Sequence, residues 1–556
     1  MDPSNHDGES RYQQQAIDAE INSLGESIYA LRCRNEPAPI SSLPTEIIAA
    51  IFLLVRSSGR PDIHLAHVCR RWREIALDHP LFWSHLDFTT VSSAGATEIL
   101  ARAKMTPLYL EAKVPGPLWD NNWFVSFQKE LQTHVSHIYH LRISGQPYYL
   151  NGTLKGLTSP APTLEHLSLS GQRSFFSDRL SQVSVPDTVF DNTTPKLSSL
   201  ELLNCSISWK SPLLKGLKNL TIRLSIGATP SLKNWLDALE EMPQLNNLVL
   251  HSASPSDPHF PFHVERTITL PSLSRLDIST SELDCGLALA HLVLPSLTSL
   301  CVTARSNHPT VDDVQKMLPY VVQHAQGPQD SDPLRSVSIS VERTYIVILS
   351  CHTPNINRDD SECDAELPAR VVLSVTTRRS YSALDDHTRT SILDAALVSL
   401  PLDNLVMLTS PYDTRLDEHF WRRHVSRWPL LRHVRLALHA ARGFIEMLLQ
   451  DNGGRECPVF PSLTRLELTD NKLSARRTLH LCDTLMKRVE QGVPLEVLDV
   501  RTCTVTGLAI QLLSEIVVDV WAPEGLETTG RERSMHLTWD GTRGPFIFDD
   551  DFVAEF

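Results

Sequence analysis

One motif, L-x-x-L-x-L introduced by proline, decides the fold predicted for this chain. It reads PTLEHLSLS at residues 162–170, PKLSSLELL at 195–203, PQLNNLVL at 243–250, PSLSRLDIS at 271–279 and PSLTSLCVT at 295–303. Apolar and other residues alternate with a period of two in each copy. This alternation predicts a short β-strand with one buried face.

The motif recurs along most of the chain. Leu273 follows Leu245 by 28 residues, and Leu495 follows Leu463 by 32 residues. Periods of ~20–29 residues are typical of leucine-rich repeats, and loops lengthen some units. The other copies are Ile138, Leu141, Ile143; Leu217, Leu220, Ile222; Leu334, Val337, Ile339; Leu402, Leu405, Met407; Leu431, Val434, Leu436; Leu463, Leu466, Leu468; and Leu495, Leu498, Val500.

Helical apolar patterns occupy several of the gaps between these strands. They run over residues 232–242, 393–400 and 479–489. We therefore predict an α/β fold over residues 100–528, a curved leucine-rich-repeat solenoid with parallel strands inside and helices outside. No single unit can bury its apolar face alone, so neighbouring units must stack.

The residues between the leucines should face away from the core and form the concave surface of this solenoid. A curved, charge-mixed array of this kind suits a protein partner, although any one position can equally be a solvated side chain. The expected binding residues are His166, Glu201, Arg223, His251, Arg275, Asp277, His433, Arg435, Arg465, Glu467, Asp499 and Arg501.

The composition limits the classes of function. The chain has 556 residues and a net charge of −14, which disfavours a general affinity for nucleic acid or an anionic membrane. Its start has no basic and apolar signal pattern, and no apolar run approaches the ~18–20 residues of a membrane span. The ten scattered cysteines form no C-x-x-C pair. We expect free thiols and a cytoplasmic or nuclear location.

Known catalytic motifs are absent from the sequence, so we expect no enzyme and no cofactor. Three groups of residues are candidate metal ligands: His134, His137 and His140; Cys351, His352 and Cys363; and Asp549 to Asp551. Each lacks a dense ligand set. We interpret the first as partly exposed histidines at a rim, the second as a loop and the third as part of an acidic tail at 529–556.

A heptad pattern precedes all of this, within an amphipathic helix predicted over residues 11–36. Ile17, Ile21, Leu24, Ile28 and Leu31 are spaced 4, 3, 4, 3. Two heptads fall short of the three or four that identify a coiled coil. The helix therefore either folds back on its own chain or self-associates through residues 17–31, and residues 1–10 before it are expected to be disordered.

A compact helical block follows at residues 40–88. Pro44 suits the first turn of a helix, Glu46 suits its dipole, and residues 47–55 carry a helical apolar stripe. A second helical stripe runs over 65–76, and Leu81, Phe82 and Trp83 form a bulky cluster. So many large apolar residues in so short a block must pack on another domain or on a partner.

This block resembles an F-box. The resemblance is carried by LPTEII at 43–48, by LAHVCRRWR at 65–73 and by PLFW at 80–83. A longer loop between the helices, at Ser57 to Asp62, departs from the simplest pattern. The order heptad helix, F-box and leucine-rich repeats is similar to a recurrent architecture among F-box-like proteins.

The resemblance implies that the chain is a substrate-receptor subunit of a cullin–RING ubiquitin ligase, docked on a Skp-type adaptor. The residues that would enter or complete the adaptor contact are Leu43, Pro44, Ile47, Ile51, Phe52, Val68, Cys69, Trp72, Leu81 and Trp83. Trp72 and Ile75 could equally belong to the core of the block. The alternatives are a scaffold that never joins a ligase, and an enzyme built on the solenoid, which the missing motifs disfavour.

Overall fold

The structure is a computed structural model. It describes residues 17, 19–30, 39–55, 63–114, 121–172, 183–224, 230–256, 264–295, 298–326, 333–341, 345–351, 370–377, 385–410, 416–424, 427–449 and 458–523. Residues 1–10, Leu31, Leu297 and the tail at 529–556 lie outside these ranges. The chain divides into two compact units, Met1–Leu167 with Thr188–Lys196, and Ser168–Asp187 with Leu197–Phe556.

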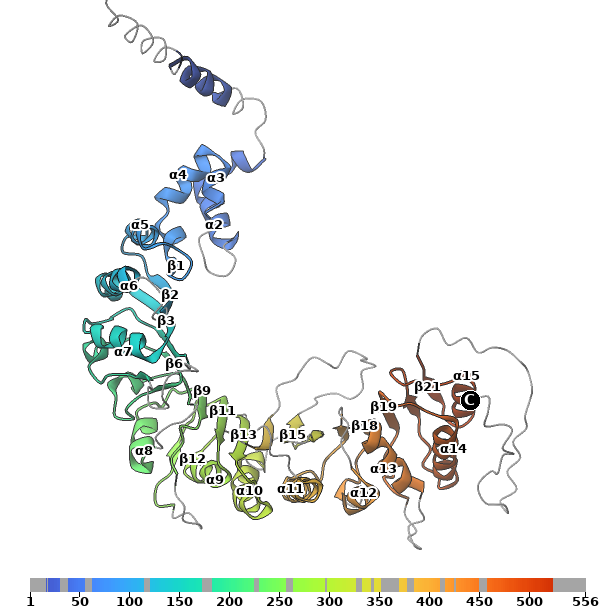
Figure 1. The fold of residues 1–556 in the computed structure, drawn as a ribbon. Helices are drawn as coiled ribbons and strands as arrows, with labels where there is room; N and C mark the ends of the chain where they lie inside the picture. The colour runs from blue at the N-terminus through green and yellow to red at the C-terminus, as the bar shows by residue number, and fades with distance from the viewer. Residues whose placement is uncertain are drawn as a thin grey trace, which may run out of the picture. The chain divides into compact units, whose positions relative to one another are not determined.

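The first unit begins with helices and continues into strands (Figure 1). Residues 19–30 are helical. The elements after them are η2 (Pro39–Ser42), α2 (Thr45–Val55), α3 (Leu65–Val68), α4 (Arg70–Asp78), η4 (Pro80–Trp83), β1 (His85–Asp87), α5 (Ser93–Ala103), β2 (Leu108–Val114), α6 (Asn121–His134), η5 (Val135–His137), β3 (Ile138–Gly145), α7 (Pro147–Gly156) and η6 (Val189–Asn192). Strands β1, β2 and β3 pair in parallel.

The second unit alternates strands and helices. In chain order its elements are β4 (His166–Gly171, which starts at the division), β5 (Val183–Ser184), β6 (Ser199–Leu203), β7 (Cys205–Ser206), η7 (Pro212–Leu214), β8 (Asn219–Arg223), α8 (Leu232–Glu240), β9 (Asn247–His251), β10 (Ile268–Thr269), β11 (Arg275–Thr280), α9 (Glu282–Ala290), β12 (Leu292–Val293), β13 (Ser299–Ser306), α10 (Val311–Gln326), β14 (Ser336–Val341), β15 (Tyr345–Cys351), β16 (Val371–Thr377), α11 (Asp386–Ser399), β17 (Met407–Ser410), α12 (Glu418–His424), β18 (His433–Ala437), α13 (Leu438–Leu449), β19 (Arg465–Thr469), α14 (Ala475–Glu490), β20 (Val497–Asp499), α15 (Gly507–Ser514) and β21 (Asp519–Trp521).

These elements confirm a mixed α/β fold with a long sheet of mainly parallel strands. Strand β6 pairs with β8, β8 with β9, β9 with β11 and β11 with β13, all in parallel. The same holds from β17 through β18, β19 and β20 to β21. Helices α9 to α15 contact one another in chain order and lie along one side of these strands (Figure 1).

One segment departs from the predicted all-parallel order. Strand β15 is antiparallel to both β14 and β16, and β13 pairs with β16 instead of β14. Only three residues separate β14 from β15, which allows a hairpin, whereas a parallel pair needs a crossover of a dozen residues or more. The hairpin inverts the local strand order to β13, β16, β15, β14, β17.

The polar side chains that start several helices explain where those helices begin. Ser231, Ser281, Asp385 and Thr506 each accept a hydrogen bond from a backbone N–H in the first turn, at α8, α9, α11 and α15. Such N-caps satisfy backbone donors that have no partner within the helix.

Candidate interaction surfaces

Helix α2 carries apolar residues on two opposite faces, and one of them is buried. The helix starts after Pro44, whose carbonyl accepts the Ile48 N–H at 3.2 Å. Ile48, Ala49 and Phe52 form the buried face of the helix. This face holds α2 against α4 and η4, which both contact it.

An aromatic cluster forms the core under α2. The Phe52 ring lies 5.1 Å from Trp72 and 6.0 Å from Phe82, and Phe82 lies 5.1 Å from Trp83, measured between ring centroids. The Trp83 indole donates to the Ala76 carbonyl at 2.7 Å. Phe52 and Trp83 are 1% and 3% exposed. Both side chains are packed within the block, and their part in an adaptor contact stays a prediction.

The other face of α2 is open. Ile47, Leu54 and Val55 are 47%, 85% and 49% exposed, and Ile51 is half-buried. The spacing i, i+4, i+7, i+8 places these four side chains on one side of the helix. Leu54 was not among the predicted contact residues. The sequence of α2 does not predict that Leu54 is exposed, because the helix has apolar residues on all sides.

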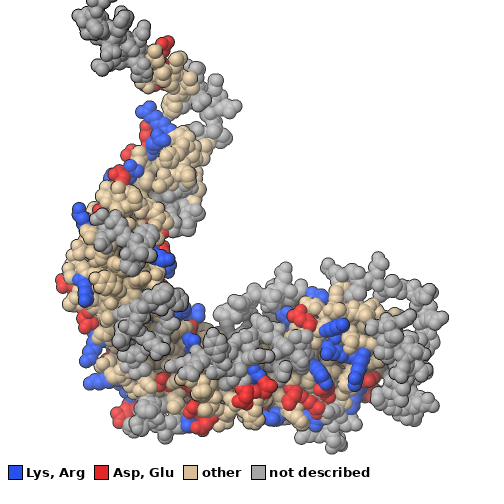
Figure 2. Space-filling model, viewed as in Figure 1, with Lys and Arg blue, Asp and Glu red and all other residues tan. Residues whose placement is uncertain are grey.

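The remaining predicted contact residues differ in how far they are exposed. Val68, Cys69, Leu81 and Pro44 are exposed, whereas Leu43 and Trp72 are half-buried. Arg71 fixes the entry to α2, because its guanidinium donates to the Leu43 carbonyl at 2.6 Å. Apolar residues make up much of the exposed surface of the block, and Figure 2 shows both acidic and basic residues beside them.

The sequence of this block matches the model of one protein family. Residues 40–89 match the F-box-like family. No curated protein matches the chain. The chain thus contains an F-box-like domain, and this domain indicates a role in docking to the adaptor of a ubiquitin ligase.

On the strand face of the second unit, the structure brings four predicted residues together. The parallel register places Arg223 beside His251, and Arg275 beside Asn247. The Asp277 carboxylate lies 3.1 Å from His251 Nε2 and 3.6 Å from Arg275 Nη2. Burial alone raises the pKa of Asp277, but the His251 hydrogen bond and the charges of His251, Arg275 and Arg223 outweigh it and lower the pKa.

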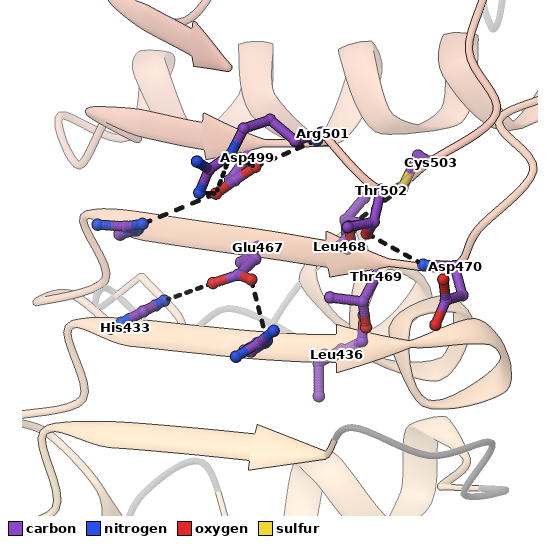
Figure 3. A network of polar contacts seen from close by, with 12 residues as sticks. His433, Leu436, Glu467, Leu468, Thr469, Asp470, Asp499, Arg501, Thr502 and Cys503 are labelled. Atoms are coloured by element: carbon purple, nitrogen blue, oxygen red, sulfur yellow. Dashed lines mark hydrogen bonds and ion pairs between the residues drawn. The ribbon is translucent and has the colours of Figure 1, made fainter. Parts of the chain in front are cut away.

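Six further predicted residues form a second charged cluster on β18, β19 and the chain around β20 (Figure 3). The Glu467 carboxylate lies 2.9 Å from Arg435 Nε and 3.5 Å from His433 Nε2. The Asp499 carboxylate lies 2.7 Å from Arg501 Nη2 and 3.7 Å from Arg465 Nη2.

Trp521 supports this second cluster from β21. The guanidinium carbons of Arg465 and Arg501 lie 4.4 and 4.9 Å from its ring centroid. Stacking on the indole fixes two cations side by side. Trp521 was missed in the sequence because it sits outside any L-x-x-L-x-L copy.

Two predicted strand-face residues lie apart from both clusters. Glu201 accepts a hydrogen bond from Ser168 at 2.8 Å. His166 belongs to the first unit, where its ring lies 5.4 Å from His140. The predicted continuous surface therefore consists of separate polar groups, several of them already paired.

The candidate metal residues do not converge. His137 is buried, not partly exposed as predicted, and lies 3.4 Å from His134. Burial lowers the pKa of both side chains. His140 instead stacks on Tyr109 at 4.2 Å. Among the described residues no group of three or more His, Cys, Asp or Glu could hold a metal ion. His352, Cys363 and Asp549 to Asp551 lie outside the described residues.

The described part of the chain has two further properties that bear on function. None of its helices is both long and apolar enough to cross a membrane. Cys69, Cys205, Cys285, Cys301, Cys482 and Cys503 are free thiols.

Proposed function

We propose that this chain is a substrate-receptor subunit of a cullin–RING ubiquitin ligase. The F-box-like domain docks on a Skp-type adaptor, and a leucine-rich-repeat solenoid presents the substrate. The chain contributes no catalytic group. It acts by proximity, because it raises the effective concentration of a substrate near the ligase.

The observation that carries the proposal is the open apolar face of α2 within a domain that matches the F-box-like family. Large aliphatic side chains at i, i+4, i+7 and i+8 are the usual anchors of a helix that binds in a groove. The buried aromatic cluster keeps α2 in place without using this face. The helix is therefore presented ready for a partner.

The register of the strands supports a repeat solenoid. Leu220, Leu248, Leu276 and Leu300 lie directly beside one another on adjacent parallel strands, and all four are buried. Val434, Leu466 and Leu498 form a second such row. Equivalent motif positions thus stack from unit to unit, as in leucine-rich repeats.

A buried Cys or Asn at a fixed place after the strand supports the same conclusion. The pattern L-x-x-L-x-L-x-x-N/C is complete at Cys205, Asn471 and Cys503. Cys503 donates its S–H to the Leu468 carbonyl, one unit earlier, at 3.1 Å. Burial raises the pKa of Cys503 to about 11, so the thiol keeps the proton it donates.

Cys205 occupies the same position with the same kind of contact. Its S–H donates to the Leu169 carbonyl at 3.5 Å, and burial raises its pKa to about 12. These side chains satisfy backbone carbonyls inside the turn, where an unpaired carbonyl is costly. The repeated position links successive units into a stack.

Direct titration of the full chain with a purified Skp-type adaptor tests the proposal. We expect wild-type protein to bind and Leu54→Asp to bind at least about 30-fold more weakly, because a charge replaces a central anchor. Val518→Asp is the matched control, since Val518 is 84% exposed but lies in the second unit. Leu43→Ala combined with Pro44→Ala should also weaken binding.

Two results would overturn the proposal in different ways. Failure of the wild type to bind any Skp-type adaptor would leave the alternative, a scaffold that uses the same two surfaces outside a ligase. Wild-type affinity of Leu54→Asp would show that the adaptor does not use the open face of α2. A cytoplasmic or nuclear location follows from the proposal, because the ligase acts there.

A further inference from the structure

The helix at residues 19–30 exposes its apolar stripe. Ile17, Ile21, Leu24 and Ile28 are 52%, 60%, 56% and 50% exposed. An isolated helix shorter than ~12–15 residues is marginal in water, and its stability normally comes from a packed apolar face. An exposed stripe favours self-association over the alternative in which this helix folds back on its own chain.

The identity of the residues along the stripe indicates what covers it. Spacings of 4, 3 and 4 assign Ile17 and Leu24 to heptad position d, and Ile21 and Ile28 to position a. Leu31, outside the described residues, continues position d. Position d is isoleucine at 17 and leucine at 24 and 31, and both a positions are isoleucine. In the heptads with leucine at d, isoleucine at a favours a parallel, two-stranded coiled coil.

The flanking positions agree with a pair of identical helices. Glu20 falls at position g and in a parallel pair faces position e of the next heptad in the second copy, which is Gly25. No like charge opposes it there. Gly25 has no heavy atom within 4 Å of the place of a Cβ, so this edge is open as well.

We propose that residues 17–31 bind the same residues of a second copy of this chain as a parallel coiled coil. The pairing is independent of adaptor docking, which uses α2. Eight residues separate Ala30 from Pro39, so each dimer carries two F-box-like domains close to its seam. A complex that carries two adaptors, or a substrate that carries two binding sites, would then bind the dimer more tightly, because the second contact forms at a high effective concentration.

Sedimentation velocity of the full chain over a range of concentrations tests the pairing. We expect a species of twice the 62.4 kDa chain mass that dissociates on dilution, because the seam is short. Ile21→Lys with Ile28→Lys should raise the dissociation constant at least ten-fold. Ala19→Lys with Ser23→Lys adds the same charge outside the seam and should leave it unchanged.

Cysteine crosslinking tests the parallel register. Ile21→Cys should crosslink to its own copy under mild oxidation, because identical a positions face each other, whereas Ala19→Cys should not exceed the wild-type background. A monomer at every concentration, or a dimer unaffected by the seam lysines, would overturn the proposal. Adaptor binding by the Ile21→Lys, Ile28→Lys protein separates this outcome from a failure of the docking proposal.

Discussion

The two faces of α2 predict that folding and docking can be separated by neighbouring substitutions. Phe52 is 1% exposed and packs on Trp72 and Phe82, whereas Leu54 is 85% exposed. Phe52→Ala should lower the stability of the block, and Leu54→Ala should lower its affinity for a Skp-type adaptor. Each substitution should leave the other property nearly unchanged, once the folded fraction is taken into account.

The magnitudes follow from burial. Truncating a buried phenylalanine to alanine costs ~3–5 kcal/mol of stability. Leu54→Ala changes stability by about 0.5 kcal/mol or less, since its side chain has few neighbours to lose. In a filled groove the same truncation removes three buried carbons at ~0.8 kcal/mol each, or about 2.4 kcal/mol. That corresponds to about a 60-fold rise in the dissociation constant.

Two measurements on the full chain separate these effects. Hydrogen exchange of the amides in α2 and α4 reports the local stability of the block, and titration with purified adaptor reports affinity. Phe52→Leu replaces Phe52→Ala if the block unfolds, because leucine keeps part of the packing. The reasoning fails if Leu54→Ala exposes the amides of α2 as much as the phenylalanine variant does, or if it binds the adaptor like wild type.

Three further predictions concern single residues elsewhere. Gly25→Ala should stabilise each helix of the proposed dimer by about 1 kcal/mol, so that the dissociation constant measured by sedimentation velocity falls by roughly 30-fold. A higher dissociation constant would contradict the heptad assignment. Cys503→Ala should destabilise the β19–β20 turns by ~1–3 kcal/mol, seen as faster local hydrogen exchange, whereas Cys503→Asn should be milder because asparagine occupies this position in other repeats. Asp277→Asn should reduce stability in urea at pH 7 but much less at pH 3. The lowered pKa means that the carboxylate stabilises the fold above its unfolded pKa of 3.8, and that this stabilisation is lost as the pH falls through the pKa of the folded state. An equal loss of stability at both pH values would exclude this role.

The stacking of the strands was predictable from the sequence because the leucines encode it. Leu248, Leu276 and Leu300 each sit at the second leucine of their copies, and they lie side by side in the sheet. The hairpin of β14 and β15 was not predictable from that pattern. Alternation with a period of two is the same in parallel and antiparallel strands, and only the length of the connection distinguishes them.

The sequence predicted that candidate surfaces exist better than it predicted which residues are exposed on them. Large apolar residues at 47–55 predicted a helix with more apolar area than its own core needs, yet not which residues stay exposed. Phe52 is buried because it packs on the Phe82 and Trp72 rings, whereas no motif in the sequence marks Leu54 as a side chain that stays exposed. The motif indicates which residues lie between the leucines, but the pairing between their charges depends on side-chain geometry that no single motif contains.

That pairing determines how the proposed substrate face can be tested. Asp499 is 2% exposed and its carboxylate depends on Arg501 and Arg465. Removing either arginine leaves a buried charge with less compensation, which is destabilising for reasons unrelated to any substrate. Arg223 is exposed, and its charge is the smallest of the effects that lower the pKa of the buried Asp277, so its truncation leaves that carboxylate in contact with His251 and Arg275. A loss of substrate binding in Arg223→Ala would therefore identify a contact, whereas the same loss in Arg501→Ala would need the stability of β20 measured beside it.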